Sequence, residues 1–109
     1  MIQEEHAEGI VYDATSDKAR ITTGLRPEAR APADVELLLD GNGFLVGVDM
    51  GGGEMSRVVV MLGPHEAVAK VTSARVEVAR DAKGHVAEIT IEKARGAIQA
   101  AGRSPYFRE

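Results

Sequence analysis

Residues 35–50 read VELLLDGNGFLVGVDM, in which two apolar runs flank the tetrapeptide from Asp40 to Gly43. Aspartate, asparagine and glycine readily adopt the positive φ angles that tight hairpin turns need. The apolar runs on both sides are typical of strands. This stretch therefore predicts a β-hairpin, and it is the strongest hairpin pattern in the chain.

A similar pattern occurs 41 residues further along the chain. Residues 76–91 read VEVARDAKGHVAEITI and align with residues 35–50 without a gap, with four identical positions. Each hairpin is preceded by a strand that ends in glycine, so the two units span residues 18–50 and 57–91. The match indicates an internal repeat, although two unrelated hairpins with the same turn residues would also produce it.

Other segments also favour strands. Residues 9–13 and 18–23 lie on either side of a polar turn. Residues 57–62 form a continuous apolar run, which is typical of a strand buried on both faces. Residues 25–34 contain two prolines, and we expect a connection there because proline disrupts the pairing of a central strand.

The expected fold is all-β, a small antiparallel sandwich or barrel of about seven strands. Residues 66–71 fit either a helical turn or a short strand. Residues 93–101 have helical composition, and a short C-terminal helix there would make the fold β-rich α+β. We expect a single β domain over residues 1–102 and a tail over residues 103–109.

The composition narrows the class of protein. The chain has 109 residues, no cysteine and a formal net charge of −4. This length suits one domain, and the absence of cysteine excludes disulfide scaffolds, zinc fingers and thiol catalysis. No apolar run approaches the roughly 20 residues that a membrane-spanning helix needs. We therefore expect a cytoplasmic protein that binds no membrane.

Charge is distributed unevenly along the sequence. Residues 1–54 carry eleven acidic and four basic residues, whereas residues 55–109 carry six acidic and nine basic ones. The two halves either attract each other within one fold or meet between subunits. Only two tyrosines and two phenylalanines are present, with no tryptophan, so a base-stacking surface is not available. We therefore expect no binding of nucleic acid.

Three features are candidates for a ligand site. Asp49 either ends its strand in solvent, the reading that we favour, or lies as a perturbed carboxylate in a buried pocket. Gly51, Gly52 and Gly53 could present backbone amides to an anion, although a flexible linker has the same composition. His65 lies in a connection, and an isolated surface histidine is the simpler reading of it.

No pattern in the sequence points to catalysis or to a metal. The three histidines are far apart and form no pair at the spacing of metal ligands. Residues 40–51 lack the glycine and glutamate positions of a calcium-binding loop. A serine nucleophile elbow is also missing. We expect no catalytic residue, no metal site and no cofactor.

The last residues combine aromatic and basic side chains. Tyr106, Phe107 and Arg108 stand together near the end of the sequence. Aromatic residues and arginine often anchor contacts between proteins. The tail therefore either docks on a protein partner or another subunit, docks on its own domain, or is a disordered terminus.

Two turn motifs follow each other in the first half, Tyr-Asp-x-x-x-Asp at residues 12–17 and Asp-x-x-Gly-x-x-x-Gly at residues 40–47. In this order of motifs, residues 10–50 resemble a family of small uncharacterised bacterial β domains. Residues 70–91 resemble the strand pair of a PRC-barrel-like domain, an interaction module. Both resemblances imply a β fold, and neither implies catalytic residues.

Two kinds of function follow from these observations. The leading hypothesis is a non-enzymatic binding or structural module that self-associates as a homo-oligomer, because its apolar strands need cover and its halves carry complementary charge. The alternative is a small-ligand-binding protein or enzyme with a site at a subunit interface. That site would use Asp49, His65 or the segment from Gly51 to Gly53.

Overall fold

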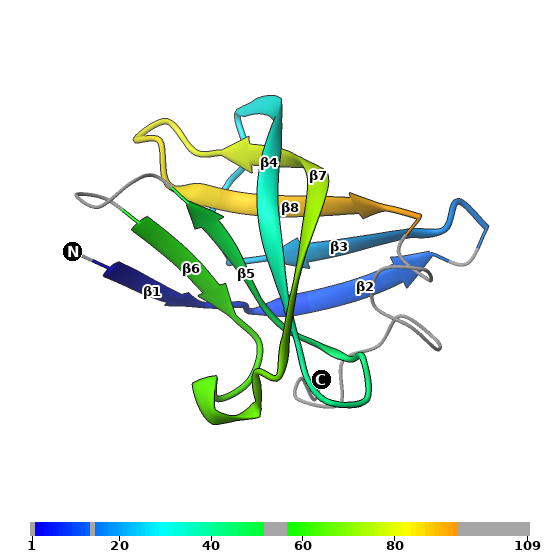
Figure 1. Cartoon of the computed structure of the whole chain (residues 1–109). Helices are drawn as coiled ribbons and strands as arrows, with labels where there is room; N and C mark the ends of the chain where they lie inside the picture. The colour runs from blue at the N-terminus through cyan, green and yellow to red at the C-terminus, as the bar shows by residue number, and fades with distance from the viewer. Residues whose placement is uncertain (1, 14, 52–56, 94–109) are drawn as a thin grey trace.

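The computed structural model describes residues 2–13, 15–51 and 57–93, which form eight strands and one 3₁₀ turn (Figure 1). In chain order the elements are β1 (Ile2–His6), β2 (Gly9–Asp13), β3 (Lys18–Thr22), β4 (Ala29–Leu39), β5 (Leu45–Gly51), β6 (Arg57–Met61), η1 (His65–Ala67), β7 (Lys70–Arg80) and β8 (Val86–Glu92). The prediction of an all-β fold is confirmed.

All eight strands belong to one strongly curled sheet that forms a half-barrel (Figure 1). The order across the sheet is β1-β6-β5-β4-β7-β8-β3-β2. Neighbouring strands are antiparallel except for β1 and β6, which run parallel. The sheet is therefore mixed, where the sequence predicts a purely antiparallel one.

The two end strands of the sheet are consecutive in the sequence. β1 pairs with β6 at one end of the sheet, and β2 pairs with β3 at the other. In the sequence, only Ala7 and Glu8 separate β1 from β2. The Ala7 amide donates to the Met61 carbonyl oxygen at 2.9 Å, and the Glu8 amide donates to the Thr22 carbonyl oxygen at 2.7 Å. The N-terminal segment thus links opposite edges of the curled sheet.

The two predicted hairpins are confirmed, and they correspond strand for strand. Adding 41 to the bounds of β4 and β5 gives the bounds of β7 and β8. Asp40 Oδ1 accepts hydrogen bonds from the amides two and four residues ahead, at 2.8 and 2.9 Å. Asp81 Oδ1 does the same in the second turn, at 2.9 Å in both bonds. The two turns therefore share one geometry.

The hairpins lie side by side through β4 and β7, with Asp34 and Arg75 at the centre of that pairing. From this centre the sheet has equivalent strands in both directions, β5 and β8 first, then β6 and β3. β3 precedes the first hairpin but pairs with the second, and β6 precedes the second hairpin but pairs with the first. Each unit therefore contributes a strand that pairs with the hairpin of the other unit.

The concave face of the sheet holds the main core. Strands β2 to β8 all contribute to it, and its largest fully buried side chains include Ile21, Leu37, Leu45, Val48, Ile89 and Ile91. A smaller cluster lies on the outer face of β5 and β6 and consists of Val46, Val59 and Met61, with Leu38, Ala67 and Val68 packed against it. β6 is therefore buried on both faces, as its apolar run predicts.

The predicted connection over residues 25–34 is wrong, because β4 begins at Ala29. Pro32 pairs in register with Glu77 of β7, whereas the pairing of β4 with β5 begins only at Glu36. The first part of β4 thus has a paired neighbour on one side only. A proline there leaves no gap in a second ladder, which explains how the strand tolerates it.

Three further segments differ from the predicted pattern or lie partly outside the described residues. β1 is an eighth strand that the pattern does not predict, because residues 2–6 are mostly polar and pair as a strand through distant β6. Residues 66–71 contain parts of both η1 and β7, so each of the two readings describes a part of them. The predicted helix over residues 93–101 lies outside the described residues except for Lys93, which lies in a turn with φ 54°.

Candidate functional site

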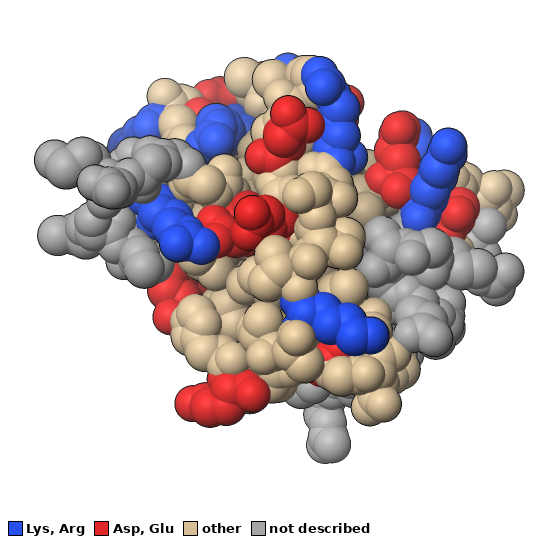
Figure 2. Space-filling model, viewed as in Figure 1, with Lys and Arg blue, Asp and Glu red and all other residues tan. Residues whose placement is uncertain are grey.

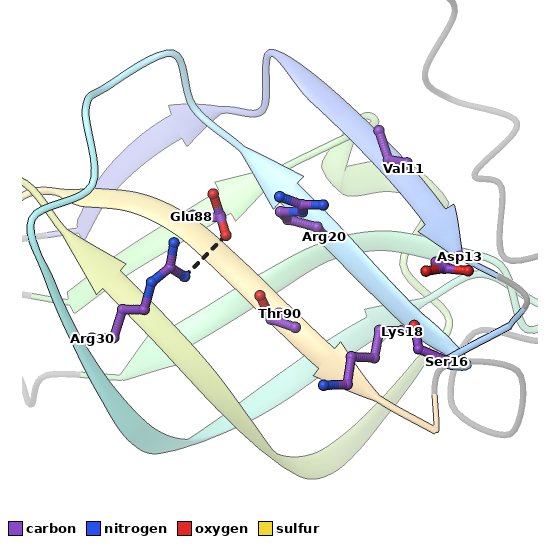
Figure 3. Close-up of a pocket in the computed structure, with 8 residues that line it drawn as sticks. All are labelled: Val11, Asp13, Ser16, Lys18, Arg20, Arg30, Glu88 and Thr90. Atoms are coloured by element: carbon purple, nitrogen blue, oxygen red, sulfur yellow. Dashed lines mark hydrogen bonds and ion pairs between the residues drawn. The ribbon is translucent and has the colours of Figure 1, made fainter.

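A hollow of about 250 Å³ opens on the outer face of the sheet around β2, β3 and β8 (Figure 3). Alternate residues of a strand point to one face, which brings the outward side chains of neighbouring strands together here. Apart from one valine the lining is polar, and it consists of Val11, Asp13, Ser16, Lys18, Arg20, Arg30, Glu88 and Thr90.

One ion pair crosses the hollow. Glu88 is only 8% exposed, and its Oε1 accepts a hydrogen bond from Arg30 Nη1 at 3.1 Å. Ala79 of β7 lies between the two residues in register, and its small side chain lets Arg30 reach β8. The nearby carboxylates of Glu88 and, to a smaller extent, Glu77 raise the pKa of Arg30. The guanidinium therefore stays charged and neutralises Glu88.

Two other cations line the hollow and are less engaged. Lys18 Nζ lies 3.5 Å from Glu92 Oε1, and both side chains are exposed, so this pair contributes little. Arg20 forms no ion pair or hydrogen bond within the part of the chain that the structure describes. Asp13 accepts a hydrogen bond from the Thr15 amide at 2.9 Å, which is the main cause of its lowered pKa. The hollow thus keeps cationic groups available for a ligand.

Asp49 lies outside this hollow and is buried, so the favoured reading of it as a solvent-exposed strand end is wrong. It is 4% exposed, and its Oδ1 accepts a hydrogen bond from the Gly51 amide at 2.9 Å. Its Oδ2 accepts hydrogen bonds from Arg57 Nε, at 2.9 Å, and from Arg57 Nη2. The Arg57 bonds, followed by the Gly51 amide, hold the pKa of Asp49 below its ordinary value. The carboxylate is therefore charged and engaged by its own chain.

The other predicted ligand residues have different surroundings. His65 is exposed in η1, with Nε2 lying 2.8 Å from Glu4 Oε2. Gly51 ends β5 with φ 72°, a conformation that favours glycine. Gly52 and Gly53 lie outside the described residues, as do Tyr106, Phe107 and Arg108 of the predicted docking tail. The role of all these residues stays a prediction.

The residues of the hollow are absent from the sequence-based set of candidates. Glu88 and Thr90 alternate with apolar residues of β8, so the pattern places both on one face of a strand. Arg30 lies in the segment that the two prolines mark as a connection, and Glu88 is 58 residues away in the sequence. Alternation could therefore locate half of the hollow, and only the strand register brings in the rest.

Opposite charges are distributed over the folded surface differently from their distribution along the sequence. Figure 2 shows acidic and basic side chains intermingled on one face of the molecule. Two ion pairs join an acid of the first half of the sequence to a base of the second, namely Asp49–Arg57 and Asp34–Arg75 at 3.9 Å. Part of the attraction between the halves thus acts within the fold, and contact between subunits stays a prediction.

No group of three or more histidine, aspartate or glutamate side chains within residues 2–13, 15–51 and 57–93 could hold a metal ion. Within the same ranges, no helix has the length and apolar character needed to cross a bilayer.

Comparison with known proteins adds no relative. No family model, curated protein or solved structure matches this chain. The resemblances of residues 10–50 and 70–91 to known domains therefore stay predictions.

Proposed function

We propose that this chain is a non-enzymatic binding module that self-associates as a homodimer by pairing β2 with β2 of a second copy. We also propose that its two hairpin units arose by duplication of one unit. The observation that carries the proposal of self-association is that β2 ends the sheet order and, among the described residues, pairs with one strand only.

β2 is an end strand of the sheet. Among the described residues it pairs on one side only, with β3, and that pairing has a continuous register. Residues Gly9–Asp13 include no lysine and no proline, which many proteins use to protect an edge strand from a second chain. Val11, at the centre of β2, is 57% exposed. An edge of this kind accepts a further strand by backbone hydrogen bonding.

A second copy of β2 fits this edge without a charge conflict. Antiparallel pairing centred on Val11 places Asp13 opposite Gly9 of the partner subunit and Ile10 opposite the partner's Tyr12. No two like charges face each other in this register, and the two exposed valines meet on the outer face. The contact is the same from both sides, as a two-fold dimer requires.

The outer face supports a binding role in place of a catalytic one. Its two buried carboxylates, Asp49 and Glu88, each accept hydrogen bonds from an arginine, Arg57 and Arg30 respectively. A carboxylate held in this way orders the strands around it. The shared strand bounds and shared turn bonds of the two hairpins support their origin by duplication.

The test measures molar mass by light scattering at micromolar concentration. We expect the wild type to have twice the monomer mass of 11.6 kDa. Val11→Lys should return the mass to that of a monomer, because two ammonium groups would face each other across the two-fold axis. Val71→Lys is the matched control, since Val71 is 55% exposed on β7 in the interior of the sheet order, and this variant should stay dimeric.

Two results would overturn the proposal. A wild-type mass of 11.6 kDa throughout the concentration range would exclude self-association. A dimer that persists in Val11→Lys, or that is lost equally in Val71→Lys, would place the interface away from the edge of β2.

A further inference from the structure

Equivalent positions in the two hairpins carry different groups on the outer face. Adding 41 to the number of Asp49, in β5, gives Thr90, in β8. Asp49 pairs in register with Val59 of β6, and Thr90 pairs with Arg20 of β3. Val59 and Arg20 therefore occupy equivalent positions on the strands that flank the two hairpins.

In the first hairpin, the position equivalent to Thr90 holds the carboxylate of Asp49. Arg57 lies two residues before Val59, and its guanidinium binds the buried carboxylate of Asp49. The Gly51 amide binds the other oxygen of that carboxylate at 2.9 Å. This part of the outer face is thus complete, with a cation and an anion in contact.

In the second hairpin a cation stands at the equivalent position, but Thr90 replaces the buried carboxylate, and the carboxylate near this cation is the exposed Glu92, 3.5 Å from Lys18 Nζ. Lys18, two residues before Arg20, stands at the position equivalent to that of Arg57, and Arg20 adds a second cation directly opposite Thr90. Figure 3 shows Thr90 in the middle of the hollow with Lys18, Arg20 and Arg30 around it. The hollow thus lies where the first hairpin holds the carboxylate of Asp49.

We propose that this hollow binds the carboxylate group of a small organic acid, held over Thr90 by Arg20 and Lys18. The planar guanidinium of Arg20 can bind both oxygens of a carboxylate, and the Thr90 hydroxyl can donate a further hydrogen bond. A volume of about 250 Å³ accommodates a small acid.

The acidic side chains in and beside the hollow contact partners other than Arg20, including the exposed Glu92, whose Oε1 lies 3.5 Å from Lys18 Nζ. Glu88 is already neutralised by Arg30, whose Nη1 lies 3.1 Å from its Oε1. Asp13 accepts the Thr15 amide at 2.9 Å and lies next to Lys18 in the register of β2 and β3. Arg20 forms no such pair within the described parts of the chain, so its charge is free to meet a ligand.

This site goes beyond the proposed self-association and does not depend on it. The test is a titration of the uniformly ¹⁵N-labelled protein with sodium acetate, followed by amide chemical shifts, with sodium chloride at equal ionic strength as the reference. We expect saturable shifts confined to the amides around Arg20, Glu88 and Thr90. The dissociation constant should lie in the millimolar range, because acetate has few contacts to offset its loss of freedom.

Four variants make the test specific. Thr90→Asp should abolish acetate binding, because it supplies the missing carboxylate from within the chain. Thr90→Asn has the same shape without the charge and should retain binding. Arg20→Gln should weaken binding about tenfold, the usual scale for one charge-assisted hydrogen bond. Arg75→Gln removes an exposed arginine outside the hollow and should leave binding unchanged.

Each of three results would overturn the proposal. Shifts that do not saturate, or that chloride reproduces, would exclude a carboxylate site. Equal loss in Thr90→Asn and Thr90→Asp would mean that shape rather than charge controls the hollow. Unchanged binding in Arg20→Gln, with a well-dispersed amide spectrum, would remove the cation on which the site depends.

Discussion

The outer faces of the two hairpins differ although their backbones correspond. Residues that pair in register on adjacent strands form a row across the sheet. One such row crosses β7, β4, β5 and β6 and consists of Val71, Leu38, Gly47 and Met61. The equivalent row across β4, β7, β8 and β3 consists of Arg30, Ala79, Glu88 and Thr22. The first row is apolar, and a Cβ added to Gly47 would come within 2.7 Å of the Met61 sulfur. The second row carries the Arg30–Glu88 ion pair.

This difference shows which part of a repeated unit is constrained by the fold. The inner faces pack against each other in one core, so both hairpins keep apolar residues there. The outer faces have different surroundings in the described parts of the chain. Ala67 and Val68 pack against the first one, whereas charged and hydroxyl side chains form a hollow on the second. The pairing of strands thus preserves the backbone while the outer side chains diverge.

The largest expected effect tests the shared inner face. Val48 and Ile89 are equivalent and fully buried. Ile89→Ala should lower the free energy of unfolding by about 3 kcal/mol, and Val48→Ala by about 2 kcal/mol because one fewer carbon is removed. Urea denaturation measures both values. A loss in one hairpin without a comparable loss in the other would show that they do not share a core.

A smaller effect tests the outer faces. Asp49→Thr places in the first hairpin the residue that the second has at this position, and it should cost about 2 kcal/mol at neutral pH. Arg57 and the Gly51 amide lose their acceptor, and burial makes that loss matter. Asp34→Thr, at an exposed ion pair, is the control and should change the stability by less than about 0.5 kcal/mol.

The same variant gives a dependence on pH. Folding lowers the pKa of Asp49 from its ordinary value of 3.8, mainly through Arg57, so the unfolded state binds the proton more tightly. The stabilisation is therefore complete above that ordinary value and is lost as the pH falls through the lowered one. Urea denaturation of wild type and Asp49→Thr should show a difference that narrows below about pH 4. A difference that is constant with pH would contradict a charge-based role.

The smallest expected effect tests the shared turns. Gly43 and Gly84 have φ values of 88° and 85°, which a side chain makes unfavourable. Gly43→Ala and Gly84→Ala should each cost about 1 kcal/mol, equally within error. Gly41→Ala is the control, because a Cβ there meets nothing within 4 Å and φ is not positive. Thermal unfolding of the three variants measures these costs. Unequal costs for Gly43→Ala and Gly84→Ala would contradict a common turn geometry.

The sequence predicts the parts of the fold that depend on neighbouring residues. Alternating apolar residues and the Asp-x-x-Gly turns locate both hairpins, because strand period and turn chemistry are local signals. These local signals do not predict where β4 begins. Pro32 is tolerated in β4 because β5 does not pair with that part of the strand. β1 likewise becomes a strand through β6, more than fifty residues away.

The candidate site is less predictable than the fold. Outward alternation marks Glu88 and Thr90 as neighbours on one face of β8. Arg20 and Arg30 reach that face from β3 and β4, and their spacing in the sequence does not predict that they lie near Glu88 and Thr90. Asp49 also differs from its favoured reading, because Arg57 binds it from the next strand. Ion pairs between strands depend on register, which a single local pattern does not contain.

The sequence by itself determined two hairpins with aspartate–glycine turns, an all-β fold and the apolar faces of the hairpin strands. These features depend on residues a few positions apart, so local propensity and alternation are enough to specify them. Only the tertiary structure decided that β3 and β6 each pair with the other unit's hairpin and that residues 7–8 link the two sheet edges. It alone placed Lys18, Arg20 and Arg30 around Thr90, because contacts between distant strands are set by the packing of the whole sheet.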